Sequence, residues 1–143
     1  MNADLNMARC ILEQEGCTCV LCSGETVYKS SRRGVVPLMG WLESGTDLRG
    51  FSAADKVVGK ATAFLYCLLG VKEVYARVMS EAAAQVLEQQ GMPFGYDQLV
   101  PAIQNRTGDG LCPMERATMQ IHDPADAPAA IRQALANLTD KKE

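Results

Sequence analysis

The chain has 143 residues, of which 48% are hydrophobic, 22% charged and 6% aromatic. This composition is typical of one globular domain and excludes a disordered, collagen-like or disulfide-scaffold chain. Lys and Arg number 14 against 17 Asp and Glu, a net charge of −3, so no overall positive field exists to hold duplex nucleic acid or an anionic membrane. We therefore expect a single domain over residues 1–143.

No stretch of the sequence has the pattern of a targeting or membrane-spanning segment. Charged side chains interrupt the apolar residues of the N-terminus, unlike a signal peptide. The longest apolar run, residues 61–71, is shorter than the roughly 20 residues of a membrane span. We expect a cytoplasmic protein, in which the six cysteines are reduced thiols.

The first elements are predicted to be a helix and a β-hairpin. Apolar residues recur at helical spacing from Leu5 to Leu12, and Gly16 follows as a stop. Two short extended runs, 17–21 and 26–28, then flank a Ser-Gly-Glu turn, a pattern typical of a hairpin.

Residues 31–50 are predicted to form a long irregular connection. The segment has four glycines and one proline, and an apolar stretch runs from Val35 to Trp41. Connections of this length are often functional or form an interface. We therefore expect a homodimer that is formed through the region 35–41.

A central helix is predicted over residues 52–69. Its first residues have the form of a capping box, in which Ser52 bonds the third amide and Asp55 reaches back to the cap. From there to Leu69 the sequence is apolar on nearly every side of a helix, which is typical of a helix buried all round.

The second half of the chain alternates strand and helix, as an α/β fold does. The predicted elements are a strand over 73–79 covered on both faces, a helix from Ser80 to Gln90, an edge strand over 96–103 limited by Pro101, and a terminal helix with Ile131, Leu135 and Leu138 on one face.

Lys56 and Lys60 would lie one turn apart at the start of the central helix, where they repel each other and oppose the helix dipole. A negative group is expected opposite them, either Asp55 or a bound anion, because helix N-termini favour phosphate or carboxylate. Gly59 favours the close approach of another backbone or a ligand. The alternative is that both lysines reach solvent and that Asp55 only caps the helix.

A second group of candidate residues lies between Asn105 and Glu115. Arg106 precedes a glycine turn, and Cys112 stands at the predicted N-cap of a helix, where a thiolate is stabilised and could act as a nucleophile. The favoured alternative is a small buried Cys112, with Glu115 completing a structural cap. His122, the only histidine, is expected at an exposed helix start.

Cys17, Cys19 and Cys22 have the spacing C-x-C-x-x-C. On a strand the first two point to one face and the third to the other, and no second pair completes a tetrahedral site. We therefore expect core packing and no metal.

Three stretches together resemble a small bacterial family of uncharacterised proteins grouped with the cytidine deaminase-like superfamily. They are Ala54-Asp55-Lys56-Val57-Val58-Gly59-Lys60-Ala61, Val100-Pro101-Ala102-Ile103-Gln104-Asn105-Arg106 and Cys112-Pro113-Met114-Glu115. The resemblance covers most of the chain. It implies a three-layer α/β/α sandwich on a mixed sheet.

The resemblance also implies where zinc ligands would stand. In the zinc deaminases of that superfamily a His- or Cys-x-Glu motif begins the second helix, and Pro-Cys-x-x-Cys begins the third. Here these helices are expected to begin within 52–56 and 79–83, and every zinc ligand is missing. Without three protein ligands no zinc ion activates a water, so we expect a zinc-independent protein with no cofactor.

Three functions remain as hypotheses. The first is a domain that binds a small anionic or nucleotide-like molecule near the start of the central helix; its candidate ligand-binding residues are Ser52, Lys56, Lys60, Asn105, Arg106 and Glu115. The second is a zinc-independent enzyme on such a substrate, with Asp55 as acid or base, Lys56 beside it and Cys112 as nucleophile. The third is a homodimeric interaction module without turnover. We favour the binding hypothesis, because it requires the fewest special roles for residues of the sequence.

Overall fold

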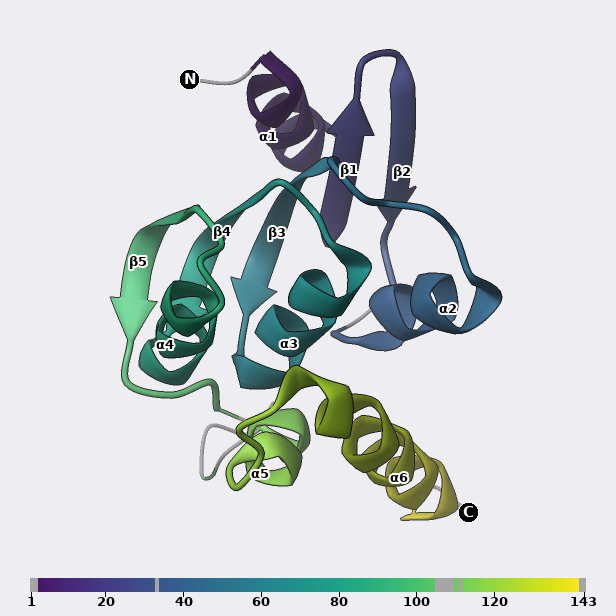
Figure 1. Ribbon diagram of the computed structural model, residues 1–143, viewed down its shortest axis with the longest axis vertical. Helices are drawn as coiled ribbons and strands as arrows, with labels where there is room; N and C mark the ends of the chain where they lie inside the picture. The colour runs from purple at the N-terminus through teal and green to yellow at the C-terminus, as the bar shows by residue number, and fades with distance from the viewer. Residues whose placement is uncertain (1–2, 33, 105–109, 111, 142–143) are drawn as a thin grey trace.

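The computed structural model describes residues 3–32, 34–104, 110 and 112–141 (Figure 1). In chain order the elements are α1 (Ala3–Glu15), β1 (Cys19–Ser23), β2 (Thr26–Ser30), α2 (Val36–Ser44), β3 (Ser52–Val58), α3 (Lys60–Leu69), β4 (Glu73–Ser80), α4 (Glu81–Gln89), β5 (Phe94–Val100), α5 (Pro113–Thr118), the 3₁₀ turn η1 (Pro124–Asp126) and α6 (Ala127–Lys141).

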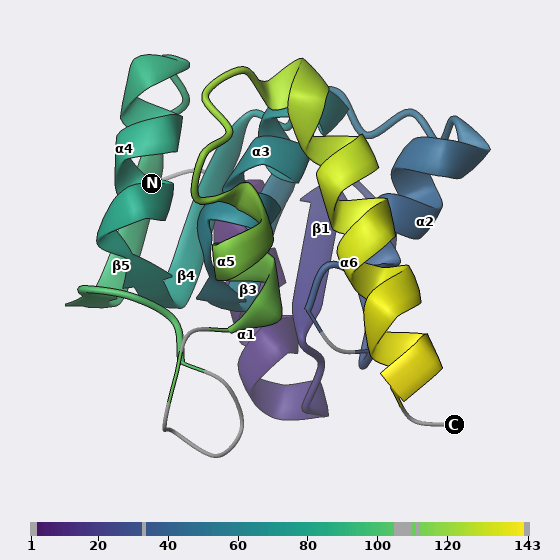
Figure 2. The same cartoon turned by 90° about the horizontal axis from the view of Figure 1, so that it is seen from below.

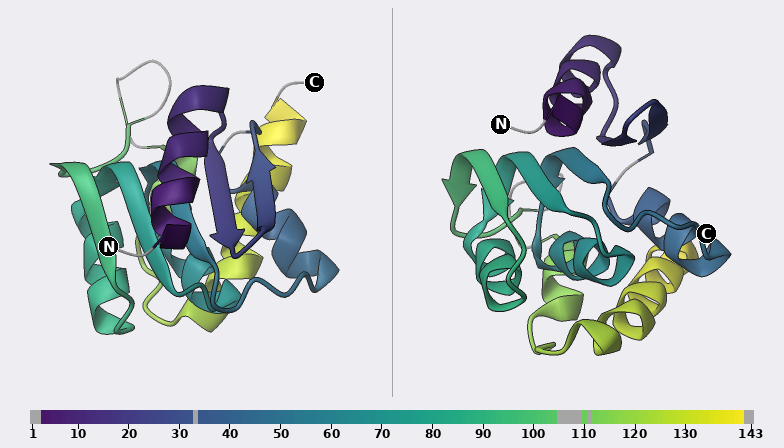
Figure 3. Two further views of the ribbon diagram at one scale, coloured as in Figure 1. Left: turned by 90° about the horizontal axis from the view of Figure 1, so that it is seen from above. Right: turned by 45° about the horizontal axis from the view of Figure 1, so that its top comes forward.

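The strands form one mixed sheet in the order β2-β1-β3-β4-β5. β1 is antiparallel to both β2 and β3, whereas β3, β4 and β5 are parallel. Parallel neighbours need crossover connections, and α3 and α4 supply them. Helices cover both faces of the sheet: α1 lies on one, and α3 and α4 lie on the other (Figure 3). α5 and α6 pack against α3 (Figure 2).

Several predicted elements are confirmed. The first helix, the hairpin, the strand β4 and the edge strand β5 lie where their patterns placed them, although β5 begins and ends earlier than expected. Ser80 caps α4 by accepting a hydrogen bond from the Ala83 amide at 3.1 Å. Along α6, Ile131 is fully buried, and Leu135 and Leu138 pack against the core.

The prediction of a helix from residue 52 is wrong, because Ser52–Val58 is the strand β3. Both faces of this strand are buried: Ala53 packs on the side of α3 and Ala54 on the side of α1. Such a strand has the same unbroken apolar pattern as a buried helix. Ser52 does not cap; its hydroxyl donates to Glu73 Oε2 at 2.7 Å. The helix α3 begins only at Lys60.

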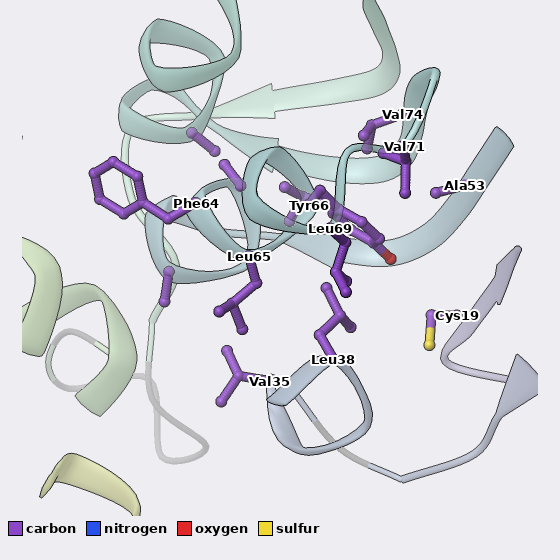
Figure 4. Close-up of a cluster of buried hydrophobic side chains, with 14 of the residues drawn as sticks. Cys19, Val35, Leu38, Ala53, Phe64, Leu65, Tyr66, Leu69, Val71 and Val74 are labelled. Atoms are coloured by element: carbon purple, nitrogen blue, oxygen red, sulfur yellow. The ribbon is translucent and has the colours of Figure 1, made fainter. Parts of the chain in front are cut away.

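The prediction of an irregular connection over 31–50 is also wrong, because residues 36–44 form the helix α2. Its apolar side chains and that of its N-cap residue fill the protein's own core: Val35 and Leu38 are buried there (Figure 4), and so is Met39. Trp41 meets Tyr28 edge to face, with ring centroids 5.9 Å apart. Much of the apolar stretch 35–41 therefore packs inside the monomer, and a homodimer through this region stays a prediction.

The core has two parts, one on each face of the sheet. The larger cluster lies between the sheet and α2, α3 and α4, and the smaller one lies under α1. Cys19 belongs to the larger cluster, whereas Cys17 and Cys22 belong to the smaller one. Contrary to the prediction, Cys17 and Cys19 therefore lie on different faces, because the strand begins only at Cys19. All six cysteines are free thiols.

Two further features concern metal ligands and the length of the helices. Within residues 3–32, 34–104, 110 and 112–141, no three His, Cys, Asp or Glu side chains are grouped so that they could hold a metal ion. No described helix has the length and apolar character needed to cross a bilayer.

Candidate functional site

A hollow of about 430 Å³ lies at the ends of the parallel strands. Its lining residues are Val57, Val78, Val100, Pro101, Ala102, Ile103 and Gln104. The first three come from the carboxyl-terminal parts of β3, β4 and β5, and the others follow β5 directly. Ligands of open α/β sheets bind outside the carboxyl ends of the strands, so this hollow is the candidate site.

The local course of the strands opens the hollow. Val57 and Val78 are partners in the β3–β4 register. On β4, Ala76 and Met79 both join the larger core cluster, although residues three apart on a regular strand face opposite ways. The alternation of side chains between the two faces of the sheet is therefore interrupted between Ala76 and Met79. Val57 is left 43% exposed, and β5 ends before Pro101, which cannot donate to a strand ladder.

Glu115 holds the wall of the hollow against the start of α3. Its side chain is buried, with Oε1 accepting from the Lys60 amide at 2.6 Å and Oε2 from the Ile103 amide at 3.3 Å. Gly59 makes room for it, since a Cβ atom there would lie 2.7 Å from Glu115 Oε1. The predicted close approach at Gly59 is therefore made by a side chain, and not by a backbone or a ligand.

The negative group at the start of α3 is the carboxylate of Glu115, and not Asp55 or a bound anion as the sequence predicted. A helix N-terminus stabilises an anion through its free amides and its dipole, and here a side chain 55 residues away in the chain occupies that place. Glu115 does not complete the cap of α5, as its spacing from Cys112 predicted; it binds the amides of Lys60 and Ile103 instead.

The predicted lysine pair does not exist as such. Lys56 lies on β3, and its amide donates to Thr18 O at 3.0 Å. Lys60 is the first residue of α3, and its Nζ donates to Met119 O at 3.1 Å. Because Lys56 belongs to a strand and Lys60 to a helix, the two residues are not one helical turn apart. Ser52 lies at the opposite end of β3 from Val57, and Asn105 and Arg106 fall outside the described residues.

Asp55 lies in the interior and does not line the hollow. The Tyr66 hydroxyl donates to its Oδ2 at 2.7 Å, and the Val57 amide donates to Oδ1 at 3.2 Å. Burial raises the pKa of Asp55 to about 7, and these hydrogen bonds oppose the rise. Cys19 is its register partner on β1, and burial followed by the charge of Asp55 raises the pKa of that thiol well above its usual value.

Cys112 is the N-cap residue of α5, as predicted, and its side chain makes no cap hydrogen bond. It is half-buried and packs against the larger core cluster. Its amide donates to Ile103 O at 2.9 Å, which ties the start of α5 to the wall of the hollow. Among the described residues no hydrogen bond joins its thiol to a base, and the structure does not bring it together with Asp55 and Lys56 as a catalytic group.

Sequence reasoning missed the hollow itself. Its lining comes from three strands and one loop that are far apart in the chain, and isolated valines and a proline carry no chemical motif. Five of its lining residues, 100–104, belong to a stretch that in the sequence carried only the family resemblance.

The comparisons with known proteins place the chain in a family. No curated protein matches it. Among solved structures, the crystal structure of a DUF1893 family protein, TM1506 from Thermotoga maritima, has a TM-score of 0.83 and 26% sequence identity, covering 96% of this chain and 92% of that chain. The family TM1506, a domain of unknown function (DUF1893), matches residues 7–135. The chain therefore belongs to the DUF1893 (TM1506) family.

Proposed function

We propose that this chain is a zinc-independent member of the cytidine deaminase-like superfamily that binds a small nucleotide-like molecule in the hollow at the ends of β3, β4 and β5. The mixed sheet with helices on both faces supports the three-layer α/β/α sandwich that the superfamily implies. The observation that carries the function is the hollow itself, at the edge of the sheet where α/β proteins bind their ligands.

The zinc motifs of the superfamily can be compared with the observed helix starts. The helix after β3 begins Gly59-Lys60-Ala61-Thr62, later than the sequence predicted, and the helix after β4 begins Ser80-Glu81-Ala82-Ala83. Neither start contains His or Cys, so the residues present do not fit the zinc site. Binding without hydrolytic zinc chemistry is the function that these residues support.

The lining favours a flat, uncharged moiety such as a nucleobase. Six of the seven lining residues are apolar and the seventh is Gln104, whose amide both donates and accepts hydrogen bonds. A phosphate of the ligand would lie outside the hollow, because Glu115 already occupies the start of α3. Lys60, whose Nζ contacts Met119 O near the surface, is the cation closest in sequence to that place.

Thermal unfolding of the full chain with nucleobases, nucleosides and nucleotides tests this proposal. A ligand at about a hundred times its Kd stabilises the native state by about 2.7 kcal/mol. We expect Val57→Lys to abolish this stabilisation, because it places a charge in the hollow. Val27→Lys is the matched control, since Val27 is a strand valine of similar exposure, 40%, far from the lining.

Two results would contradict the proposal: no stabilisation by any of these compounds, or a stabilisation that Val57→Lys leaves intact. Lys60→Met separates the parts of the ligand. This variant should reduce the stabilisation by nucleotides and leave the stabilisation by nucleobases unchanged, because only a phosphate interacts with the ammonium group of Lys60.

No observation within the described residues favours the zinc-independent enzyme as a second candidate. Asp55 is enclosed by the core and bonded to Tyr66, so no substrate atom reaches it in this conformation. Cys112 has no described base within hydrogen-bond reach, as an activated nucleophile requires.

A further inference from the structure

Two cationic side chains adjoin the hollow on neighbouring strands. Lys56 directly precedes Val57 on β3, and Arg77 directly precedes Val78 on β4, and both valines line the hollow. Lys56 and Arg77 stand between two ladder pairs of β3 and β4, of which Val57–Val78 is one, and they do not form a ladder pair themselves. Because neighbouring strands lie about 4.8 Å apart, the two cationic side chains leave the sheet next to each other. We call them the Lys56/Arg77 pair.

The preceding residues on each strand show that this pair points to the face of the sheet on which α1 lies. Ala54 and Tyr75 belong to the smaller core cluster, under α1, and residues two apart on a strand share a face. The guanidinium of Arg77 lies 3.9 Å from the carboxylate of Glu13 on α1. The pair therefore flanks the hollow from the α1 side.

Lys60 flanks the hollow from the opposite face. It follows Gly59, whose Cβ position would lie 3.3 Å from Ile103 of the lining. Its Nζ donates to the carbonyl of Met119, the C-cap residue of α5, and α5 packs against α3. Since α1 and α3 cover opposite faces (Figure 3), the sheet separates Lys60 from the Lys56/Arg77 pair.

The charge of the Lys56/Arg77 pair is only weakly neutralised. Among residues 3–32, 34–104, 110 and 112–141, no carboxylate forms an ion pair with Lys56. The contact of Arg77 with Glu13 is too long for a hydrogen bond, and both side chains are about half exposed, so it contributes little. Like charges side by side on neighbouring strands are destabilising. An anion bound between these two side chains would relieve their repulsion.

We propose that the ligand of the hollow carries two phosphates, one near Lys60 and the other bound by the Lys56/Arg77 pair. This inference rests on the proposed function and names the ligand class: a nucleoside phosphorylated on both its 3′ and its 5′ oxygen. A single phosphate does not reach both faces of the sheet, whereas the 3′ and 5′ oxygens leave the sugar in different directions. Guanidinium and ammonium groups are the side chains that bind phosphate most strongly.

Asp97 limits where the second phosphate lies. It is the residue of β5 at the same level as Arg77, between two ladder pairs of β4 and β5, and its carboxylate accepts a hydrogen bond from the Tyr75 hydroxyl. Because this carboxylate repels an anion, the phosphate belongs on the other side of Arg77, next to Lys56.

Calorimetric titration of the full chain tests the inference, with nucleosides, their 3′- and 5′-monophosphates and their 3′,5′-bisphosphates. We expect a bisphosphate to bind at least about tenfold more tightly than either monophosphate. Lys56→Met and Arg77→Met should each weaken the binding of one monophosphate, and Lys60→Met should weaken that of the other. Lys72→Met is the matched control, since Lys72 is exposed at the opposite end of β4, and it should change no affinity.

The uncharged nucleoside separates an electrostatic role from a structural one. Its affinity should stay the same in Lys56→Met and Arg77→Met, and raising the ionic strength should reduce only the additional affinity that each phosphate provides. Free bisphosphates and the internal nucleotides of a single strand share this chemistry. A trinucleotide that binds more tightly than the bisphosphates would identify a strand as the source of the ligand, and weaker binding would identify the free compound.

Three results would overturn the inference and leave the proposed function intact. The first is a bisphosphate that binds no more tightly than a monophosphate, and the second is an additional affinity that survives both Lys56→Met and Arg77→Met. The third is an equal loss of nucleoside and bisphosphate binding in these variants while circular dichroism shows them folded. If no nucleobase or nucleoside binds the wild type, the proposed function fails and the inference fails with it.

Discussion

Asp55 places a carboxyl group inside the core, where two opposing effects act on its charge. Removal from water disfavours the ionised form, and the hydrogen bonds from Tyr66 and Val57 favour it. Desolvation is the larger effect, because the pKa rises from its ordinary value of 3.8 to about 7. The carboxyl group therefore titrates near neutrality, and it does not line the hollow. We expect its titration to change the stability of the fold and not catalysis.

The free energy of unfolding should fall as pH rises from about 4 to about 7. In that window the native state keeps a proton on Asp55 that the unfolded chain has lost, so rising pH favours unfolding. The pKa of Asp55 is higher in the native state than in the unfolded chain. Across the whole window the free energy of unfolding therefore falls by on the order of 4 kcal/mol, at 1.36 kcal/mol for each unit of pKa. Urea unfolding at several pH values measures it.

Asp55→Asn should remove this part of the pH dependence, because the amide stays neutral throughout and is similar in shape. The control is Asp126→Asn, an exposed carboxylate on η1, which should keep the wild-type slope. A wild type equally stable at both ends of the window would contradict the prediction, and so would an Asp55→Asn variant that retained the slope.

At the scale of elements, Glu115 joins α5, the loop after β5 and the start of α3 through two hydrogen bonds. Gly59→Ala should destabilise the fold by about 1–3 kcal/mol, the cost of losing a hydrogen bond to a buried charged group, since the new Cβ would lie 2.7 Å from Glu115 Oε1. The measurement is chemical unfolding of the single and double variants.

In the Glu115→Ala background the same change at Gly59 should cost much less, because the clashing atom is gone; contacting residues couple in this way. Gly40→Ala is the matched glycine control. Gly40 lies within α2 with no atom within 4 Å of its Cβ position, so alanine should stabilise the protein there. Equal costs of Gly59→Ala in both backgrounds would show that Glu115 is not the cause.

The elements that sequence predicts correctly are those with local signals. The hydroxyl of Ser80 does cap α4, and the turn at Gly24 adopts the positive φ, +60°, that favours glycine. β3 has no such signal, because its conformation is fixed by strands on both sides. The contact between Gly59 and Glu115 depends on how α5 packs, and no local pattern reports a partner that far along the chain.

At the scale of the whole molecule, the larger core cluster joins most of the chain. It contains Leu38 of α2, Phe64 of α3, Met114 of α5 and Ile131 of α6, together with residues of the sheet. None of these helices buries its apolar side without the others. We therefore predict one cooperative unfolding transition for the helices on this face, as small single domains show.

The fluorescence of Trp41, the only tryptophan, reports α2, and far-ultraviolet circular dichroism reports all helices. Both signals should change at the same denaturant concentration. The smaller cluster, which Leu5, Ala8 and Leu12 form with the other face of the sheet, shows whether α1 belongs to the same cooperative unit. Leu12→Ala should lower both midpoints together if α1 unfolds with the rest, because its buried side chain stabilises by about 2–5 kcal/mol. Separate midpoints in the wild type would divide the chain into two folding units and contradict the prediction.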